Sequence, residues 1–386
     1  MKIAFVIANG YTMGGTVRTV YNLAEGLSRN HEVEIVSLAR KREDTFFRLP
    51  EGVRIIPLSD ARPGAPEPEH KPGDLARFWW SRRAEQIVPE SERARNRNYT
   101  PEAVAALHRY LRTTDADVVM GTRPGINLLI ASWAPKRVRT IGQEHLNLNE
   151  HTAEVAEAIS RLYPRLNGVS VLTDTDRKAY AERTAVPQQR LVVMPNPLDA
   201  EQRPRSALSE PAIAAAGRLS PVKQYPKLLK AFTHVVEKHP EWRLRIYGSG
   251  DQEKKIRRTI EQLGLEDNVE LMGQTKDVLG SLSQASVLAI SSRVEGFGMT
   301  IVEGFSVGVP VVSFDCPHGP REIIEHGHDG LLVPPQDVDA LGKAMLSLVE
   351  DPAERERMGD NALVSAQRYG LDDITRRWEG FLKTLR

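Results

Sequence analysis

Residues 291–303 read SSRVEGFGMTIVE, a stretch that joins the end of a strand to a glycine-rich turn and the start of a helix. The apolar run 285–290 before it predicts a buried strand, and residues 300–307 predict a short helix. Gly296 and Gly298 let the backbone turn sharply and approach a ligand closely. Unpaired N–H groups at the start of a helix suit an anion or a sugar hydroxyl. The stretch therefore predicts a βα turn that binds a ligand; the alternative is an ordinary turn with two solvated glutamates.

Four charged side chains belong to two such turns. Glu295 lies in the turn just described and Glu303 in its helix, and eight helical residues span about 12 Å. Two carboxylates at that spacing can hold different parts of one extended ligand. Upstream, residues 214–226 again read as strand, turn and helix, with Arg218 and Lys223 on the loop that leaves the strand. Open α/β sheets bind ligands at this edge, and an arginine fork with a lysine point charge suits a diphosphate.

The paired glutamates and the upstream cations together resemble a motif of the retaining nucleotide-sugar glycosyltransferases of family four, and the resemblance covers nearly the whole chain. It implies the GT-B fold, an α/β architecture in which two Rossmann-like, doubly wound domains face a central cleft, and a UDP-sugar as donor. It implies catalytic roles for Arg218 and Lys223 at the departing diphosphate, for Glu295 at the donor-sugar hydroxyls and for His145 near the reacting carbon. It assigns donor binding to Gly14, Gly15, Gly273, Phe297, Gly298 and Glu303, with Glu303 on the ribose diol.

Strand and helix patterns alternate along the chain, which predicts parallel, doubly wound sheets. Prolines on either side of residue 196 limit the freedom of the chain and mark a boundary. We expect a first domain over residues 1–195 that binds the acceptor and a second over 196–370 that binds the nucleotide sugar. Residues 371–386 carry an apolar stripe at helical spacing, and the resemblance implies that this helix crosses back to the first domain.

The composition argues against several other classes of protein. The chain has 386 residues, 52 basic and 51 acidic side chains and a net charge of +1, so no global field attracts nucleic acid or a membrane. The one cysteine, Cys316, excludes an intrachain disulfide framework, fits a reducing compartment and is expected to be a small buried hydrophobe. The apolar start, residues 1–10, is too short for a signal peptide, and no apolar run is long enough to span a bilayer. We expect a cytoplasmic protein that does not bind nucleic acid.

An aromatic and basic stretch, FWWSRR, occupies residues 78–83. It predicts a helix with a packed aromatic face and a solvated basic face. The alternative is peripheral contact with a membrane surface, such as the inner face of the cell membrane, or with an anionic polymer. The oligomeric state does not follow from the sequence.

Two D-x-D sequences, at residues 115–117 and 174–176, match a metal-binding motif. Helix ends and strand starts of a β/α chain supply such matches by chance, and no histidine or cysteine cluster has the spacing of a zinc site. Arg218 and Lys223 can themselves meet the charge of a diphosphate. We therefore expect no metal and no cofactor, with the UDP-sugar acting as a substrate.

The sequence leaves two alternatives for the acceptor, a polymeric or lipid-linked glycan and a soluble small molecule. Glu144, Glu150, His151 and Asp174 could bind acceptor hydroxyls or amines near His145, or they could be solvated helix caps. Further on, residues 317–322, PHGPRE, resemble a turn of transferases that act on cell-envelope polymers and secondary metabolites.

We expect this enzyme to transfer a hexosyl unit from UDP-glucose, UDP-N-acetylglucosamine or a similar donor to an acceptor hydroxyl of a cell-envelope glycan or secondary metabolite, with retention at the anomeric carbon. One alternative on the same architecture is a UDP-N-acetylglucosamine 2-epimerase, which needs acid/base groups near the second carbon of the sugar and no acceptor. Another is a catalytically silent partner that binds a nucleotide sugar. The Glu-x7-Glu spacing together with Arg218 and Lys223 favours transfer.

Overall fold

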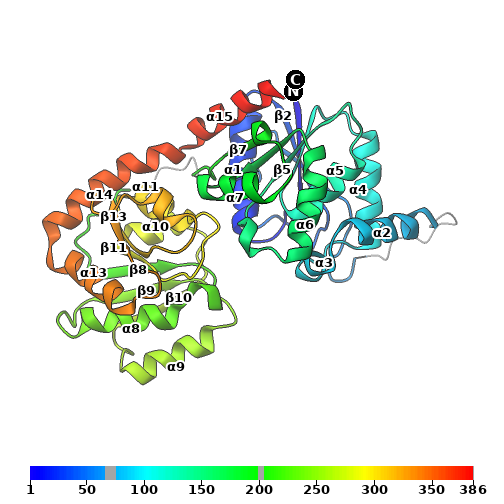
Figure 1. Ribbon diagram of the computed structural model, residues 1–386. Helices are drawn as coiled ribbons and strands as arrows, with labels where there is room; N and C mark the ends of the chain where they lie inside the picture. The colour runs from blue at the N-terminus through cyan, green and yellow to red at the C-terminus, as the bar shows by residue number, and fades with distance from the viewer. Residues whose placement is uncertain (66–74, 199–203, 386) are drawn as a thin grey trace. The chain divides into compact units, whose positions relative to one another are not determined.

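The computed structural model describes residues 1–65, 75–198 and 204–385, which form two compact units. The first unit comprises Met1–Pro197 and Leu371–Arg386, and the second comprises Leu198–Gly370 (Figure 1). This division falls two residues after the boundary that we expected from the prolines. The described part of each unit is built on one parallel sheet, which confirms the predicted fold class.

The first unit has a seven-stranded sheet in the order β3-β2-β1-β4-β5-β6-β7, as far as its residues are described. The strands are β1 (Lys2–Ile7), β2 (Glu32–Ser37), β3 (Arg54–Pro57), β4 (Val118–Gly121), β5 (Arg139–Gln143), β6 (Gly168–Val171) and β7 (Leu191–Val193). The helices are α1 (Gly15–Ser28), α2 (Leu75–Ile87), α3 (Glu90–Arg95), α4 (Pro101–Thr113), α5 (Pro124–Trp133), α6 (Ala153–Leu162), α7 (Asp174–Arg183) and α15 (Leu371–Thr384).

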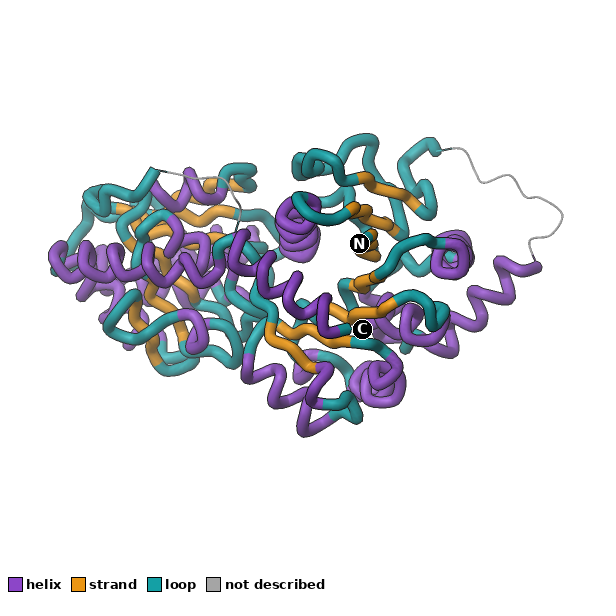
Figure 2. The backbone as a smooth tube through the Cα atoms, turned by 90° about the horizontal axis from the view of Figure 1, so that it is seen from above, coloured by secondary structure: helices purple, strands orange, loops and turns teal. Residues whose placement is uncertain are grey.

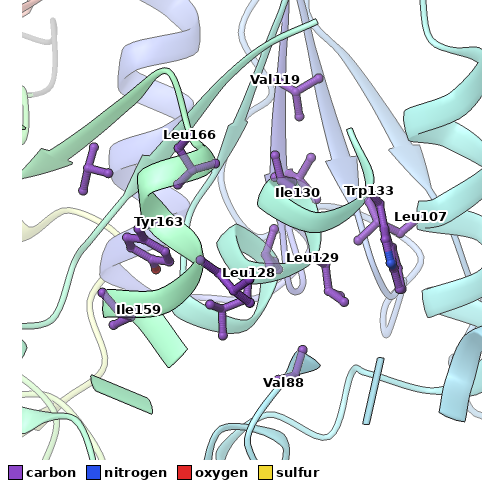
Figure 3. Close-up of a cluster of buried hydrophobic side chains, with 14 of the residues drawn as sticks. Val88, Leu107, Val119, Leu128, Leu129, Ile130, Trp133, Ile159, Tyr163 and Leu166 are labelled. Carbon is purple, nitrogen blue, oxygen red and sulfur yellow. The ribbon is translucent and has the colours of Figure 1, made fainter. Parts of the chain in front are cut away.

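Both faces of this sheet are covered by helices, because successive side chains of a strand point to opposite faces. In β1, Ile3 and Phe5 belong to the core that holds α1 and α15, whereas Ala4 and Val6 belong to the core that holds α4, α5 and α6. Figure 3 shows part of the core that holds α4, α5 and α6, with Leu107 of α4 on one side of α5 and Ile159 of α6 on the other. The near-continuous apolar sequence of β1 is thus explained by burial on both faces.

The second unit has a six-stranded sheet in the order β10-β9-β8-β11-β12-β13 within the described residues. The strands are β8 (Ala212–Ala216), β9 (Arg243–Tyr247), β10 (Val269–Gly273), β11 (Val287–Ile290), β12 (Val311–Phe314) and β13 (Gly330–Val333). The helices are α8 (Tyr225–Val236), α9 (Glu253–Leu263), α10 (Val278–Ser283), α11 (Met299–Ser306), α12 (Pro320–Ile323), α13 (Val338–Glu350) and α14 (Pro352–Ala366). The tube in Figure 2 shows helices running beside the strands in both units.

Both sheets reverse their strand order at the first strand of the unit. In the second unit β8 lies between β9 and β11, so the chain winds outward first in one direction and then in the other. Such a reversal leaves a crevice at the carboxyl ends of the two central strands, where doubly wound proteins bind their ligands. The loops that follow β8 and β11 therefore meet at the place where this architecture forms a site.

The last helix, α15, belongs to the first unit and packs along α1. Two glycines make room for it, because a Cβ atom at Gly26 would lie 2.0 Å from Oγ1 of Thr375 and one at Gly168 would lie 2.5 Å from the Phe381 ring. Trp378, in the middle of the helix, is 2% exposed. The apolar stripe of residues 371–386 is thus the face that α15 buries.

We expect Trp378→Ala to lower the free energy of unfolding of the first unit by about 3–5 kcal/mol, because the large side chain leaves a cavity between α15 and the sheet. Denaturant unfolding followed by circular dichroism measures the change. Arg376→Ala is the matched control on the same helix, since its side chain is 70% exposed and its loss should cost no more than about 0.5 kcal/mol. Equal effects of the two substitutions would contradict this packing.

Candidate active site

The loops after β8 and β11 are neighbours because the two strands pair directly, with Val287 beside Ile213 and Leu288 beside Ala214. Backbone and side-chain hydrogen bonds then tie the loops to each other. The Arg293 N–H donates to the Val222 carbonyl at 2.8 Å, and the Ser291 hydroxyl donates to the carbonyl of Lys223 at 2.7 Å. The two turns that the sequence singled out separately therefore form one structure.

An ion pair joins the two loops at their centre. Nζ of Lys223 lies 2.7 Å from Oε1 of Glu295, and the side chains are 20% and 11% exposed. The Ser292 hydroxyl donates to the same carboxylate oxygen at 2.6 Å. Two of the four residues predicted to act in catalysis are thus in direct contact, and a third side chain fixes the position of the carboxylate.

Cys316 lies behind this ion pair and is fully buried. Burial raises the pKa of its thiol to about 12, the Glu295 carboxylate adds to the rise, and the Lys223 ammonium opposes it. The thiol is therefore protonated at neutral pH and serves as a small buried group that packs beneath the site, as the sequence predicted. Tyr225 is held nearby, with its hydroxyl donating to the Gly217 carbonyl at 3.1 Å. Burial, followed by the Glu295 charge, raises the pKa of Tyr225, so this phenol also stays neutral.

Arg218 and Glu303 lie on the same two segments as the ion pair but in different surroundings. Arg218 is exposed on the loop after β8. Glu303 lies inside α11 and is only 7% exposed, which excludes the solvated glutamate of the alternative interpretation at this position. Both positions are compatible with contacts to the donor, so the roles of Arg218 at the diphosphate and of Glu303 at the ribose stay predictions.

The start of α11 is shaped by a glycine in an unusual conformation. Gly298 is the residue before the helix and has φ of +104°, a value that side chains disfavour. Phe297 beside it is 5% exposed, and its ring meets the ring of Tyr369 edge-on at 5.6 Å. This anchored aromatic side chain fixes the loop whose backbone was predicted to face the donor sugar.

Gly319 lies in the turn at residues 317–322, and no role for this glycine itself was predicted from the sequence. A Cβ atom there would lie 2.0 Å from the Phe297 carbonyl, and its φ is +61°. The turn therefore packs directly against the loop that carries Glu295. The sequence signal was the Gly-Pro pair, but the partner of the glycine lies 22 positions upstream and cannot be read from spacing.

Three further glycines were predicted to approach the donor. Gly14 and Gly15 open α1 after β1, and a Cβ atom at either would meet no atom closer than 3.8 Å. Packing within the first unit therefore does not explain these glycines. Gly273 ends β10 with φ of +71°, and its carbonyl accepts a hydrogen bond from the Gly248 N–H at 2.7 Å. All three stay predicted ligand contacts.

His145 follows β5 in the first unit, and its imidazole faces inward. Both ring nitrogens are shielded from solvent and make no hydrogen bond of good geometry, although the Asn196 side chain lies beside them. Burial lowers the pKa of His145 to about 4, and Asn196 opposes this shift. The ring lines a small cavity of about 10 Å³ together with Thr19, Trp378 and other residues of the first unit. A neutral imidazole at this position can donate one hydrogen bond and accept another but carries no charge at neutral pH.

Glu144, next in sequence, has neither of the roles that we considered for it. Its side chain is fully buried, accepts hydrogen bonds from the Tyr163 hydroxyl and from Nδ2 of Asn127, and lies 3.5 Å from Nε2 of His151. It is therefore neither a solvated cap nor an accessible contact for an acceptor. Asp174, in contrast, is a surface residue that pairs with Lys178 at 2.9 Å. The sequence alone cannot distinguish the buried carboxylate of Glu144 from the exposed carboxylate of Asp174.

The carboxylates of the two D-x-D sequences have structural partners. Asp115 pairs with the Lys2 ammonium at 2.6 Å and Asp117 accepts from the Lys2 N–H at 2.8 Å, while Asp176 accepts from the Leu148 N–H at 2.9 Å. Over the described ranges, no group of three or more His, Cys, Asp or Glu residues could hold a metal ion. Nor does any helix in those ranges combine the length and apolar character that crossing a membrane requires.

We expect the imidazole of His145 to stay neutral from pH 8 down to about pH 5 in the folded protein, because its pKa is lowered by burial to about 4. Between about pH 6.5 and pH 4 the unfolded chain takes up a proton here that the folded chain does not, so this residue reduces the free energy of unfolding as the pH falls. NMR titration of the ring protons, assigned with His145→Gln, measures the midpoint. A midpoint at or above 6.5 would show that the ring is solvated.

Two family models match the chain in succession. Residues 13–202 match the model described as Glycosyltransferase Family 4, and residues 199–364 match the one described as Glycosyl transferases group 1. A solved structure of HepE from Anabaena in complex with UDP and glucose superimposes with a TM-score of 0.78 over the full length of both chains, at 19% identity. This likeness confirms the GT-B fold.

Two curated relatives align with almost all of the chain. The exopolysaccharide phosphotransferase of Streptomyces coelicolor is 35% identical over 98% of this chain, which spans only 40% of the length of that protein. An α-1,4-N-acetyl-D-galactosaminyltransferase of Campylobacter jejuni, which acts on an undecaprenol-linked glycan, is 26% identical over 98% of this chain and 97% of its own. The two models, which together take in residues 13–364, show that the chain belongs to the group 1 glycosyltransferases with a family 4 N-terminal part.

Proposed function

We propose that the protein transfers a hexosyl unit from a UDP-sugar to an acceptor hydroxyl and retains the configuration of the anomeric carbon. The observation that carries this proposal is the ion pair between Lys223 and Glu295 at the point where the strand order of the second sheet reverses. A cation and a carboxylate side by side there match the two chemically different parts of a nucleotide sugar, its diphosphate and its sugar hydroxyls.

The cations act on the leaving group. As the bond between the sugar and the diphosphate breaks, negative charge builds up on the departing UDP, and fixed positive charges lower the energy of that state. Lys223 is held in place by Glu295, and Arg218 lies on the same loop, exposed and able to reach a ligand. The N–H groups that open α11 add further donors at the same edge.

The carboxylates hold the two ends of the donor. Glu295, with the backbone N–H groups of Phe297 and Gly298, binds hydroxyls of the donor sugar, and Glu303 accepts hydrogen bonds from the ribose diol. We keep a hydrogen bond from neutral His145 to the donor sugar as part of the proposal; it requires that the ring nitrogens, which are shielded from solvent in this structure, become accessible when the donor binds. Clamping both ends of the donor aligns its anomeric carbon with the acceptor oxygen.

The contacts of Glu295 also support retention without a covalent intermediate. Double displacement needs a carboxylate that is poised to attack the sugar from the face opposite the leaving group. Glu295 is engaged by Lys223 and Ser292 instead. We therefore propose that the acceptor attacks from the face of the departing UDP and that a phosphate oxygen of UDP takes up the acceptor proton.

The relatives indicate the class of acceptor. The named activities of the two aligned relatives concern an exopolysaccharide and an undecaprenol-linked glycan. We therefore propose a hydroxyl of a cell-envelope glycan as the acceptor and keep a secondary metabolite as the second choice. The first relative is named a phosphotransferase, which also raises transfer of a phosphate-bearing group, but this chain spans only 40% of that protein.

We expect incubation of an α-linked UDP-sugar with a glycan acceptor to release UDP and give an α-linked product. Chromatography of the nucleotide and the anomeric coupling constant from NMR, read soon after mixing, measure both. Release of UMP would instead mean that the bond between the two phosphates is cut and that a sugar phosphate is transferred. Turnover without acceptor to a C2 epimer would indicate an epimerase, binding without turnover a silent partner, and a β-linked product an inverting mechanism.

We expect Lys223→Met and Arg218→Ala each to reduce kcat by roughly 100-fold, with a smaller change in KM for the donor, because their charges matter most as the diphosphate departs. Steady-state kinetics with a UDP-sugar that gives turnover in the wild type measure both constants. Arg293→Ala is the matched control, since this neighbouring arginine is exposed and has been assigned no contact with the donor. Turnover at the wild-type rate in both site variants would refute the assignment.

We further propose that transfer requires no divalent metal, because two side-chain cations and a helix start are available for the diphosphate. Activity should be unchanged after dialysis against EDTA. An enzyme that holds a divalent metal with D-x-D carboxylates would lose its activity under the same treatment. Loss of activity that Mn²⁺ or Mg²⁺ restores would contradict this proposal.

A further inference from the structure

Helix α2 has an inner face that is fully explained by packing. The ring of Trp80 stacks on His108 of α4 with 3.3 Å between centroids and meets Trp133 of α5 edge-on at 5.5 Å. One turn later, Ala84 is 4% exposed. These contacts fix which side of the helix faces the protein.

Beyond this inner face, α2 exposes two large aromatic side chains, of which Trp79 also meets the Trp80 ring edge-on with 4.4 Å between centroids. Phe78 is 59% exposed and Trp79 is 52% exposed, which corrects our expectation that the aromatic residues of this helix would form a packed face. Each ring has an arginine one turn further along the helix, with Arg82 lying 5.0 Å from the Phe78 centroid and Arg83 lying 5.3 Å from that of Trp79. We call these four residues the α2 patch.

The charges around the α2 patch are mostly positive. Arg112 lies one turn beyond His108 on α4, the histidine that stacks on Trp80, and Arg137 donates to the Arg112 carbonyl at 2.9 Å. Both arginines are exposed, and the acidic side chain on the outer side of α2 is Glu85. Because the whole chain carries a net charge of only +1, this concentration of arginines is a local feature.

Aromatic rings beside arginines have a specific use at a membrane surface. Tryptophan is favoured at the level of the lipid headgroups, where its ring is in apolar surroundings and its N–H stays hydrated. Arginine side chains extend to the phosphates and are attracted by anionic lipids. An anionic polymer would need the arginines but would not account for two exposed rings.

We propose that the α2 patch docks the first unit on the headgroup layer of a membrane that contains anionic phospholipids. The positive charge of the patch is complementary to such a surface, and its two rings supply the apolar contact. This proposal does not depend on the transfer reaction, so the failure of either leaves the other standing.

The test uses the full chain and vesicles of equal parts phosphatidylglycerol and phosphatidylcholine, with pure phosphatidylcholine vesicles for comparison. We expect co-sedimentation with the anionic vesicles only. Arg82→Gln combined with Arg83→Gln should weaken binding by about 30-fold, since each basic side chain near an anionic surface contributes about fivefold in affinity. Phe78→Ser combined with Trp79→Ser should abolish binding. The matched control is Val364→Ser on α14, another exposed hydrophobic residue at 64%, which should bind as the wild type does.

Tryptophan fluorescence gives a second readout, which detects contact of a ring with lipid in variants that still bind the vesicles. Trp133, Trp242 and Trp378 are buried and Trp80 is partly covered, so Trp79 is the tryptophan most open to lipid. Vesicles made with brominated lipids should quench the wild type, whereas Trp79→Phe should still sediment but lose most of the quenching. Undiminished quenching in Trp79→Phe would show that lipid contacts another part of the chain.

Several outcomes would overturn the proposal. Equal binding to neutral and anionic vesicles would show that the arginines do not attract the protein to the membrane. Binding of the Phe78 and Trp79 double variant at the wild-type level would show that the rings make no contact with lipid. Light scattering that finds a dimer, dissolved by the same double variant, would assign the patch to a second copy of the chain. Binding to soluble polyglutamate but not to anionic vesicles would assign it to an anionic polymer.

Discussion

The contact between Lys223 and Glu295 is the interaction on which the candidate site depends. Both groups are largely removed from water, and a charge in such a place is costly unless an opposite charge compensates it. The loops that carry them come from β8 and β11, which are neighbours only because the strand order reverses between them. The rest of the site follows from this junction, because Ser292 fixes the carboxylate, Cys316 packs beneath it and Gly319 lets a third loop approach.

A pair of this kind has a consequence for binding the donor. If the donor binds as proposed, the carboxylate neutralises the cation that the diphosphate needs until the donor arrives. A diphosphate carries more charge than one carboxylate, so it can compete for Lys223, and the sugar hydroxyls then offer Glu295 new partners. The two residues would thus exchange a contact with each other for contacts with opposite ends of the same ligand. Under the proposed function, this exchange would link recognition of the sugar to recognition of the nucleotide.

The sequence predicts much of this architecture because its signals are local. Apolar runs of strand length, glycines after strands and helical spacing give the parallel sheets, and the loops at their carboxyl ends place Arg218, Lys223 and Glu295 on one edge. The ion pair itself joins residues 72 positions apart and cannot be read from any spacing. Burial of Glu144 was missed for the same reason, since its partners Asn127 and Tyr163 come from other helices and turns. The outward position of Trp79 follows from geometry that we overlooked: three successive aromatic residues span about 200° of a helix, so they cannot all face the core.

The affinity of UDP for single-charge variants tests the central role of the ion pair most directly. Calorimetry with UDP alone should show weaker binding by at least tenfold, about 1.4 kcal/mol, in Lys223→Met, because the diphosphate loses its cation. In Glu295→Gln, UDP should bind more tightly than in the wild type, because the carboxylate that competes for Lys223 is gone while the side-chain shape is kept. Wild-type affinity in both variants would show that the diphosphate does not bind at this junction, and weaker binding in Glu295→Gln would show that the carboxylate holds the nucleotide rather than the sugar.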